Sequence, residues 1–151
     1  MPQSLSATYV HLTFSTKKRL PFLQNQETRL ALHSYLGGIS KHLDCAPIII
    51  GGIADHVHIL ARLNRTITQA AWVKELKRIS TLWLKEQNHN LSDFAWQQGY
   101  AIFSVSKSNL EQVSKYIQNQ EQHHRGMDFQ DELRKFLLAH NIKWDEQYLW
   151  D

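Results

Sequence analysis

The chain has 151 residues, of which 42% are hydrophobic and 21% charged, and its formal net charge is +3. This length suits one domain with its own core, so we expect a single domain over residues 1–151. The only cysteine, Cys45, excludes an intramolecular disulfide, and no apolar run approaches the roughly 20 residues of a membrane-spanning helix. Because the N-terminus also lacks signal-peptide features, these properties predict a cytoplasmic protein without a membrane partner.

The first half of the chain predicts strands around one helix. Residues 7–15 (ATYVHLTFS) alternate and are rich in β-branched and aromatic side chains, which is typical of a strand. The segment from about residue 24 to residue 43 carries leucine and isoleucine at helical period. Residues 47–53 (PIIIGGI) and 56–63 (HVHILARL) are two strands with almost nothing between them, so we expect an antiparallel hairpin.

The next segment predicts a helix, a strand and a second helix. Thr68 opens an amphipathic helix that keeps its basic residues off the apolar face. Residues 96–106 (WQQGYAIFSVS) form the fourth predicted strand. Ser108 and Glu111 have the spacing of a capping box, which predicts a helix that continues to about His124.

The chain ends with a helix near residues 128–140 and an aromatic tail, residues 143–150 (KWDEQYLW), which packs on its own domain or on a second subunit. The predicted fold class is therefore α+β, a ferredoxin-like βαββαβ sandwich with an antiparallel sheet, followed by a tyrosine-bearing helix and a C-terminal helix. Two helices cover one face of the sheet, and we expect the other face to remain open.

Two histidines occupy alternate positions of one predicted strand. Because side chains alternate in a strand, His56 and His58 point to the same, open face, while Val57 and Ile59 point to the core. Two imidazoles at this separation can reach one metal ion. They can equally be two ordinary strand histidines.

The predicted helix over residues 108–124 carries a polar stripe. Tyr116, Gln120 and His124 follow one another at intervals of four residues, so they share one side of the helix. They are candidates for a nucleophile and for further metal ligands. A half-buried packing tyrosine and a solvent-facing glutamine are the structural alternatives.

Basic side chains are clustered rather than spread evenly. Short basic clusters are typical of solvated surface and also of phosphate binding. The candidates for DNA contacts are Lys17, Lys18, Arg19, Arg62, Arg65, Lys74, Lys77, Arg78 and Lys107.

Taken together, these motifs resemble those of the HUH single-tyrosine transposases, which include small insertion-sequence transposases and REP-associated tyrosine transposases. DHVHIL (residues 55–60) resembles the histidine strand of that family, and YIQNQEQHH (residues 116–124) resembles its tyrosine helix. The preceding strand and turn and the closing DEQYLW (residues 145–150) are also similar, so the resemblance covers nearly the whole chain.

The resemblance implies a prokaryotic enzyme that cleaves and rejoins single-stranded DNA, often with hairpins, through a 5′-phosphotyrosine. It assigns Tyr116 as the nucleophile and His56, His58 and Gln120 as ligands of a divalent metal ion, Mg²⁺ or Mn²⁺. It also implies a homodimer with composite active sites.

Several alternatives stay open on the residues alone. His124 is an alternative to Gln120 as a ligand, and Asp55 is a candidate to orient an imidazole. Two imidazoles suit Mn²⁺, Zn²⁺ or Ni²⁺ better than Mg²⁺, and the sequence does not identify the acceptor of the tyrosine proton. The rival functions are a non-catalytic single-stranded nucleic-acid-binding module and a metal-dependent hydrolase in which Tyr116 only stabilises charge.

Overall fold

The computed structural model describes residues 2–151, and its central element is a four-stranded antiparallel sheet. The strands are β1 (Thr8–Ser15), β2 (Pro47–Ile53), β3 (His56–Leu63) and β4 (Ala101–Val105), in the order β2-β3-β1-β4. Each neighbouring pair runs antiparallel. The sheet confirms the predicted α+β class and the βαββαβ order of a ferredoxin-like fold.

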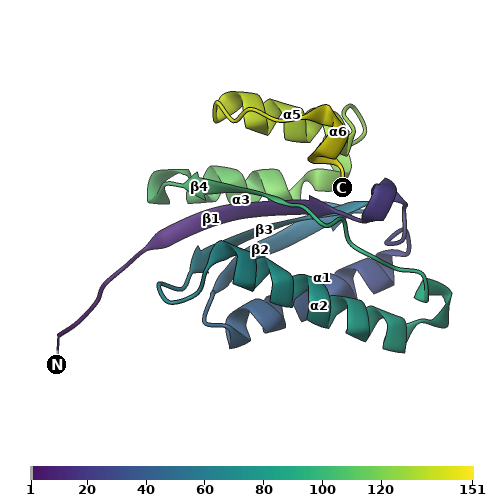
Figure 1. The fold of residues 1–151 in the computed structure, drawn as a ribbon, viewed down its shortest axis with the longest axis horizontal. Coiled ribbons are helices and arrows are strands. Elements are labelled where there is room, and N and C mark those ends of the chain that lie inside the picture. The colour runs from purple at the N-terminus through teal and green to yellow at the C-terminus, as the bar shows by residue number, and fades with distance from the viewer. Residues whose placement is uncertain (1) are drawn as a thin grey trace.

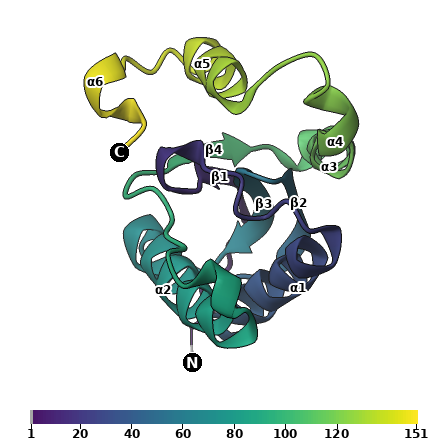
Figure 2. The same cartoon turned by 90° about the vertical axis from the view of Figure 1, so that its right-hand side faces the viewer.

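Two long helices cover one face of this sheet. They are α1 (Gln26–His42) and α2 (Gln69–Gln87), which lie side by side beneath the strands in Figure 2. Their N-termini are capped by the side chains of Asn25 and Thr68, which accept from backbone N–H groups three residues on. The core lies between helices and sheet, where Phe14 and Trp72 are completely buried. Because α1 and α2 each present one apolar stripe, the sheet needs them both to bury this face.

The second face of the sheet is covered as well, so the expected open face was wrong. The chain after β4 forms α3 (Leu110–Gln118), α4 (Gln120–His123), α5 (Phe129–Ala139) and α6 (Glu146–Leu149). Figure 1 shows α3, α5 and α6 on the side of the sheet opposite to α1 and α2. Phe129, Leu133 and Leu137 of α5 form a second apolar cluster with Phe103 of β4. The apolar stripe of α5 is buried on the face that two helices alone leave exposed.

The boundaries differ from the prediction at the third helix. A 3-10 turn (Lys107–Asn109) precedes α3, and no side chain caps the helix, so the predicted capping box was wrong. Asn119, with φ −97° and ψ 24°, interrupts the helix between α3 and α4. The fourth strand begins at Ala101, because Trp96 makes only an isolated bridge with Thr16.

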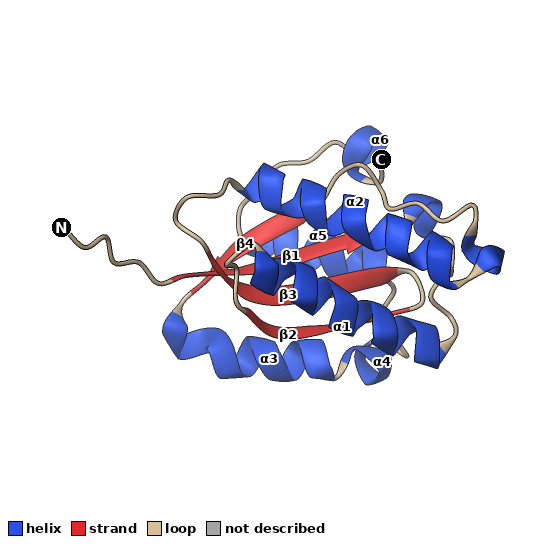
Figure 3. Cartoon of the chain, turned by 90° about the horizontal axis from the view of Figure 1, so that it is seen from below, coloured by secondary structure: helices blue, strands red, loops and turns tan. Residues whose placement is uncertain are grey.

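The C-terminal tail packs against its own chain, as one of the two predicted options had it. The carbonyl oxygen of Asp151 accepts from the N–H of Gly99 at 2.7 Å and from the Gln97 side chain at 3.2 Å. Arg134 of α5 donates to both carboxylate oxygens of Glu146 in α6. Figure 3 shows the same layers from below, with α1 and α2 in front of the strands. Within residues 2–151, no helix is long and apolar enough to cross a membrane.

Candidate metal and tyrosine site

The two histidines of β3 lie side by side beneath the C-terminal helices. His56 and His58 point to the same face of the sheet, with ring centroids 5.0 Å apart. Neither residue has any exposed surface. His56 stacks on the ring of Phe129 from α5, with a centroid distance of 4.5 Å. Because α5 covers the face of the sheet to which these two side chains point, His56 and His58 are buried rather than on an open face as the sequence predicted.

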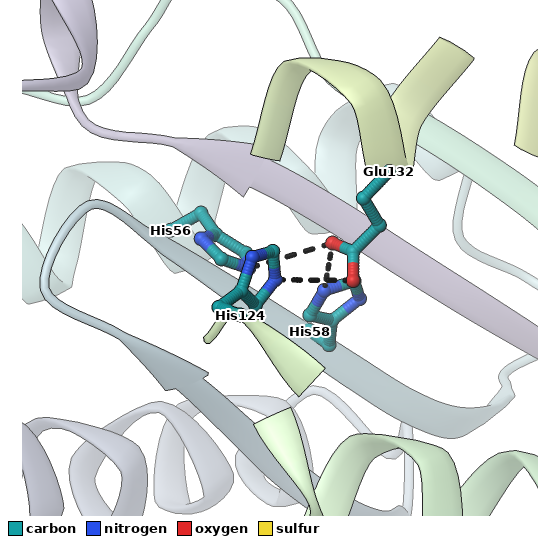
Figure 4. A group of neighbouring side chains, drawn as sticks. All are labelled: His56, His58, His124 and Glu132. Carbon is teal, nitrogen blue, oxygen red and sulfur yellow. Dashed lines mark hydrogen bonds and ion pairs between the residues drawn. The ribbon is translucent and has the colours of Figure 1, made fainter. Parts of the chain in front are cut away.

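A carboxylate from α5, Glu132, reaches both histidines. Its Oε1 lies 2.8 Å from Nε2 of His58 and 3.5 Å from Nε2 of His56, and its other oxygen lies 3.1 Å from Nε2 of His124. Figure 4 shows these three imidazoles around the carboxylate. Sequence reasoning missed Glu132, although its position directly before Leu133 and four residues before Phe136, beside the apolar stripe of a helix, was a signal of burial.

Gln120 and His124 also reach this cluster, so the structure brings both alternatives together. Oε1 of Gln120 lies 3.0 Å from Nε2 of His56 and 2.9 Å from Nε2 of His124. The amide nitrogen of Gln120 donates to Glu132 at 3.2 Å. The interruption of the helix at Asn119 precedes both residues and leaves them on the buried side, where Gln120 is only 1% exposed.

The cluster has the donor set of a transition-metal site. The ligand atoms of His56, His58, His124 and Glu132 all lie within 4.8 Å of one another. Imidazole nitrogens combined with carboxylate and amide oxygens suit Mn²⁺, Zn²⁺ and similar ions better than Mg²⁺, which prefers oxygen ligands alone. The residues present therefore fit a divalent metal ion.

Each imidazole of the cluster is held through its other nitrogen. Nδ1 of His56 donates to Asp55 at 2.7 Å, as the sequence suggested for Asp55. Nδ1 of His124 donates to the carbonyl oxygen of Met127. Nδ1 of His58 lies 2.7 Å from Nε2 of His11 on β1, a residue that the sequence analysis did not single out. Such contacts fix the ring orientation of metal-binding histidines and leave Nε2 directed at the shared centre.

The protonation states follow from burial and from Glu132. Burial by itself lowers the pKa of His56, but the hydrogen bonds and charges of Asp55 and Glu132 outweigh it and raise the pKa to about 9. Burial, followed by the neighbouring His58, lowers the pKa of His11 to about 3. Burial alone raises the pKa of Glu132, but hydrogen bonds from His124, His56 and His58 hold it well below its usual range. Glu132 is therefore an anion among imidazoles.

Tyr116 of α3 contacts the same carboxylate from the other side. Its hydroxyl donates to Oε2 of Glu132 and lies 3.2 Å from Nε2 of His123. Its ring centroid is 5.9 Å from that of His58. Burial, together with the negative charge of Glu132, raises the pKa of Tyr116 above its ordinary value. Glu132 is therefore the hydrogen-bond acceptor of the Tyr116 hydroxyl in this structure.

The basic candidates lie away from this cluster or at its margins. Lys74, Lys77 and Arg78 line a groove of about 670 Å³ between α2 and residues 94–100, on the far side of the sheet. Nζ of Lys77 donates to the carbonyl oxygens of Gln97, Gln98 and Gly99 at 2.8, 3.2 and 2.6 Å, so this side chain supports the loop.

The other candidates are mostly exposed. Arg78 pairs with Glu75, and Arg62 donates to the Ser6 carbonyl oxygen. Arg19 is half-buried, whereas Lys17, Lys18, Arg65, Lys74 and Lys107 are exposed.

The comparisons with known proteins assign the chain to a family. Residues 4–120 match the family model described as Transposase IS200 like. Among solved structures, a candidate transposase from Deinococcus radiodurans R1 has a TM-score of 0.65 and 22% identity, over 80% of this chain and 95% of that one. A REP-associated tyrosine transposase bound to a REP hairpin has a TM-score of 0.60 and 13% identity, over 82% of this chain and 72% of that one. No curated protein sequence gave a significant match. Because the family model spans most of the chain, this protein belongs to the IS200-like transposase family.

Proposed function

We propose that this chain cleaves and rejoins single-stranded DNA through a 5′-phosphotyrosine on Tyr116, with the help of a divalent metal ion. The supporting observation is that Glu132 contacts both the Tyr116 hydroxyl and the imidazoles of His56 and His58. The candidate nucleophile and the candidate metal ligands therefore share one centre. A binding module has no need of this arrangement.

The metal would be held by His56 and His58 together with oxygen atoms of Gln120 and Glu132, and His124 is a further ligand. Once bound, the ion supplies positive charge that polarises the phosphodiester and stabilises the charge of the transition state. The ligand nitrogens bind without their protons, so metal binding competes with the ion pairs of the metal-free cluster. Mn²⁺ or Mg²⁺ is the expected cofactor, and the donor set favours Mn²⁺.

Cleavage and rejoining through a phosphotyrosine need no external energy source, because the intermediate keeps the energy of the broken phosphodiester bond. The Tyr116 oxygen attacks phosphorus, the bond from phosphorus to the 3′-oxygen breaks, and the leaving oxygen takes up a proton as a 3′-hydroxyl. Glu132 accepts the hydrogen bond of the attacking hydroxyl and so orients it, and in the overall reaction the proton lost by Tyr116 is balanced by the one that the 3′-oxygen gains. When a second 3′-hydroxyl attacks the phosphotyrosine, the strand is rejoined and the tyrosine is regenerated.

Access of DNA requires a movement of the C-terminal segment. His56 and His58 are fully buried, and Phe129 and Glu132 of α5 lie over them. A phosphodiester therefore reaches the cluster only when α5 shifts. Two sets of contacts hold this segment in place. They are the ion pair between α5 and α6 and the hydrogen bonds that the Asp151 carbonyl oxygen accepts, and all of them are exposed or near the chain end.

The partner is single-stranded DNA, with hairpins of the kind that the REP-associated relative binds. Exposed basic side chains at Lys17, Lys18 and Lys74 are the leading phosphate contacts. Since the candidate nucleophile and the candidate metal ligands meet within one chain, each chain holds a complete set of these residues. The homodimer with composite sites is a proposal in which the segment carrying Tyr116 would exchange between two copies.

The test is a covalent-adduct assay with 5′- and 3′-labelled single strands from the flanks of the gene. The protein is incubated with Mn²⁺, Mg²⁺ or EDTA and run on a denaturing protein gel. We expect a labelled protein band that needs metal, disappears in Tyr116→Phe and persists in Tyr148→Phe, an exposed control tyrosine. Binding without any adduct favours the non-catalytic module, and free cleavage products without an adduct favour the hydrolase.

A further inference from the structure

A second polar cavity lies directly beside the metal cluster. It has a volume of about 370 Å³ and is bounded by α1, the edge strand β2 and the α3–α4 segment. Figure 3 shows β2 flanked by α1 and by α3–α4, which agrees with this position. Gln120 lines the cavity and also contacts His56, so one residue separates the two sites. A ligand in the cavity would therefore lie next to the reaction centre.

One residue that lines the cavity carries a buried polar atom without a partner. Nε2 of His33, on α1, is the single buried side-chain nitrogen or oxygen that lacks a hydrogen bond among the described residues. Leaving such an atom unsatisfied costs roughly 1–3 kcal/mol, so it needs an explanation. Neighbouring Arg29 and the burial of the ring keep His33 neutral, since burial and then Arg29 lower its pKa to about 4. A neutral imidazole nitrogen is suited to a hydrogen bond with a neutral polar group.

The charged residues of the cavity leave one positive charge free. Arg29 is nearly buried, donates to the Leu23 carbonyl oxygen at 2.8 Å and pairs with Glu121 at 2.8 Å. Arg125 lines the cavity as well, is exposed, and has no ion pair among residues 2–151. The residues that line the cavity thus include a neutral imidazole and an exposed guanidinium without an ion pair. This combination matches a nucleobase joined to a phosphate.

We propose that this cavity holds one unpaired nucleotide of the DNA strand, adjacent to the scissile phosphate, with its base edge on His33 and its phosphate on Arg125. The inference rests on the proposed function, because it assumes that the strand crosses the neighbouring metal cluster. Bases of single strands are unstacked and are read by hydrogen bonds to their edges. The volume lies at the lower end of the roughly 300–1,000 Å³ of small-molecule sites, so it suits one nucleotide rather than a duplex.

The test measures the affinity of DNA strands that each lack one base, both for the wild type and for variants with one substitution in the cavity. Fluorescent single strands from the gene flanks, each with one abasic position, are titrated with the full chain in EDTA, so that no cleavage occurs. For the wild type, we expect one position at which base loss weakens binding about 5- to 30-fold. In His33→Leu, the intact strand should bind about as weakly as that abasic strand, and removal of this base should change affinity less than twofold.

Two controls separate this result from misfolding and from general charge effects. His33→Leu should unfold at the wild-type temperature or higher, because it removes an unsatisfied buried nitrogen. His89→Leu, an exposed histidine outside the cavity, should keep the abasic effect. A neutral methylphosphonate beside the sensitive base should lose affinity with the wild type and not with Arg125→Gln.

The proposal is overturned if His33→Leu binds every strand like the wild type, which would mean that Nε2 holds only a water molecule. Its failure is distinct from failure of the transposase reaction. Adduct formation without base coupling refutes the cavity alone, and base coupling without any adduct leaves the cavity as a recognition site in a binding protein.

Discussion

Replacement of the buried carboxylate by an amide, Glu132→Gln, should remove at least about half of the stabilisation that a metal ion gives the protein. Glutamine keeps the size and one acceptor oxygen but loses the charge that faces His56, His58 and His124 at 2.8 to 3.5 Å. Without metal, the positive charge of His56, whose pKa is raised to about 9, keeps only Asp55 as an anionic partner. Loss of one partner from a buried pair costs about 3–5 kcal/mol. At roughly 2–4 °C per kcal/mol, the unfolding midpoint should fall by about 6–20 °C.

The increase in stability on metal binding gives a more specific prediction than the loss of stability without metal. An ion at 100 times its dissociation constant stabilises the wild type by about 2.7 kcal/mol. If loss of the carboxylate weakens metal binding tenfold or more, the same ion concentration stabilises Glu132→Gln by about 1.4 kcal/mol or less. The wild-type midpoint should therefore rise by about 5–11 °C with Mn²⁺, and that of the variant by about half as much at most.

Thermal unfolding of both proteins in EDTA and in Mn²⁺ is the assay. Glu111→Gln is the matched control, because Glu111 is exposed and only pairs with Lys115 at 3.3 Å on the surface of α3. It should follow the wild type in both conditions. An equal Mn²⁺ shift in wild type and Glu132→Gln would refute the role of the carboxylate. Coincident wild-type curves in EDTA and Mn²⁺ would refute the metal site.

Three further predictions concern packing and charge. Gly51→Ala should lower both stability and adduct yield, because its Cβ would lie 2.5 Å from a backbone oxygen of α3, whereas Gly38→Ala, with open space, should be neutral or stabilising in thermal unfolding. Lys77→Met should lower the unfolding temperature because its ammonium holds three carbonyl groups, whereas exposed Lys74→Met should only weaken DNA binding and its salt dependence. His11, with its pKa lowered to about 3, stays neutral in the folded chain, so between pH 6.5 and pH 4 the unfolded chain gains a proton that the folded chain does not. Denaturant unfolding without metal should therefore show the stability advantage of the wild type over His11→Asn shrinking by up to about 1.4 kcal/mol per pH unit as pH falls, and a constant advantage would contradict this.

The sheet and its first two helices were predictable because local patterns decide them. Alternation in β1 and β3 and the helical period of α1 and α2 each specify one buried face, and the short connection between β2 and β3 leaves a hairpin as the only solution. The coverage of the second face was not predictable in this way. The apolar stripe of α5 predicts that this helix packs against another surface, but the sequence of the helix does not specify which surface that is.

The candidate site was predictable only in part, for a similar reason. His56, His58, Tyr116 and Gln120 stand out as residue types at regular spacings within single elements. Glu132 has no such partner in the sequence, and its role depends on how α5 docks over β3.

His11 is another residue that the sequence could not assign. It lies on β1, and only the register between β1 and β3 brings it to His58.

Lys77 shows the limit of grouping charges by helical spacing. It shares a helix face with Lys74 and Arg78, and that arrangement made the three residues joint candidates for phosphate contacts. The structure separates them, because the Lys77 ammonium lies 4.9 Å from the ring centroid of Phe14 and donates to three carbonyl groups of one loop. The spacing of residues on a helix predicts which side chains are neighbours, but not which element packs above them.

Mass spectrometry of the protein after reaction with single-stranded DNA and Mn²⁺ tests the central claim most directly. After nuclease and protease digestion, the account predicts that a nucleotide is attached through a 5′-phosphate to the peptide containing Tyr116, at that side chain. Attachment at any other residue, or quantitative cleavage with no modified peptide, would contradict it.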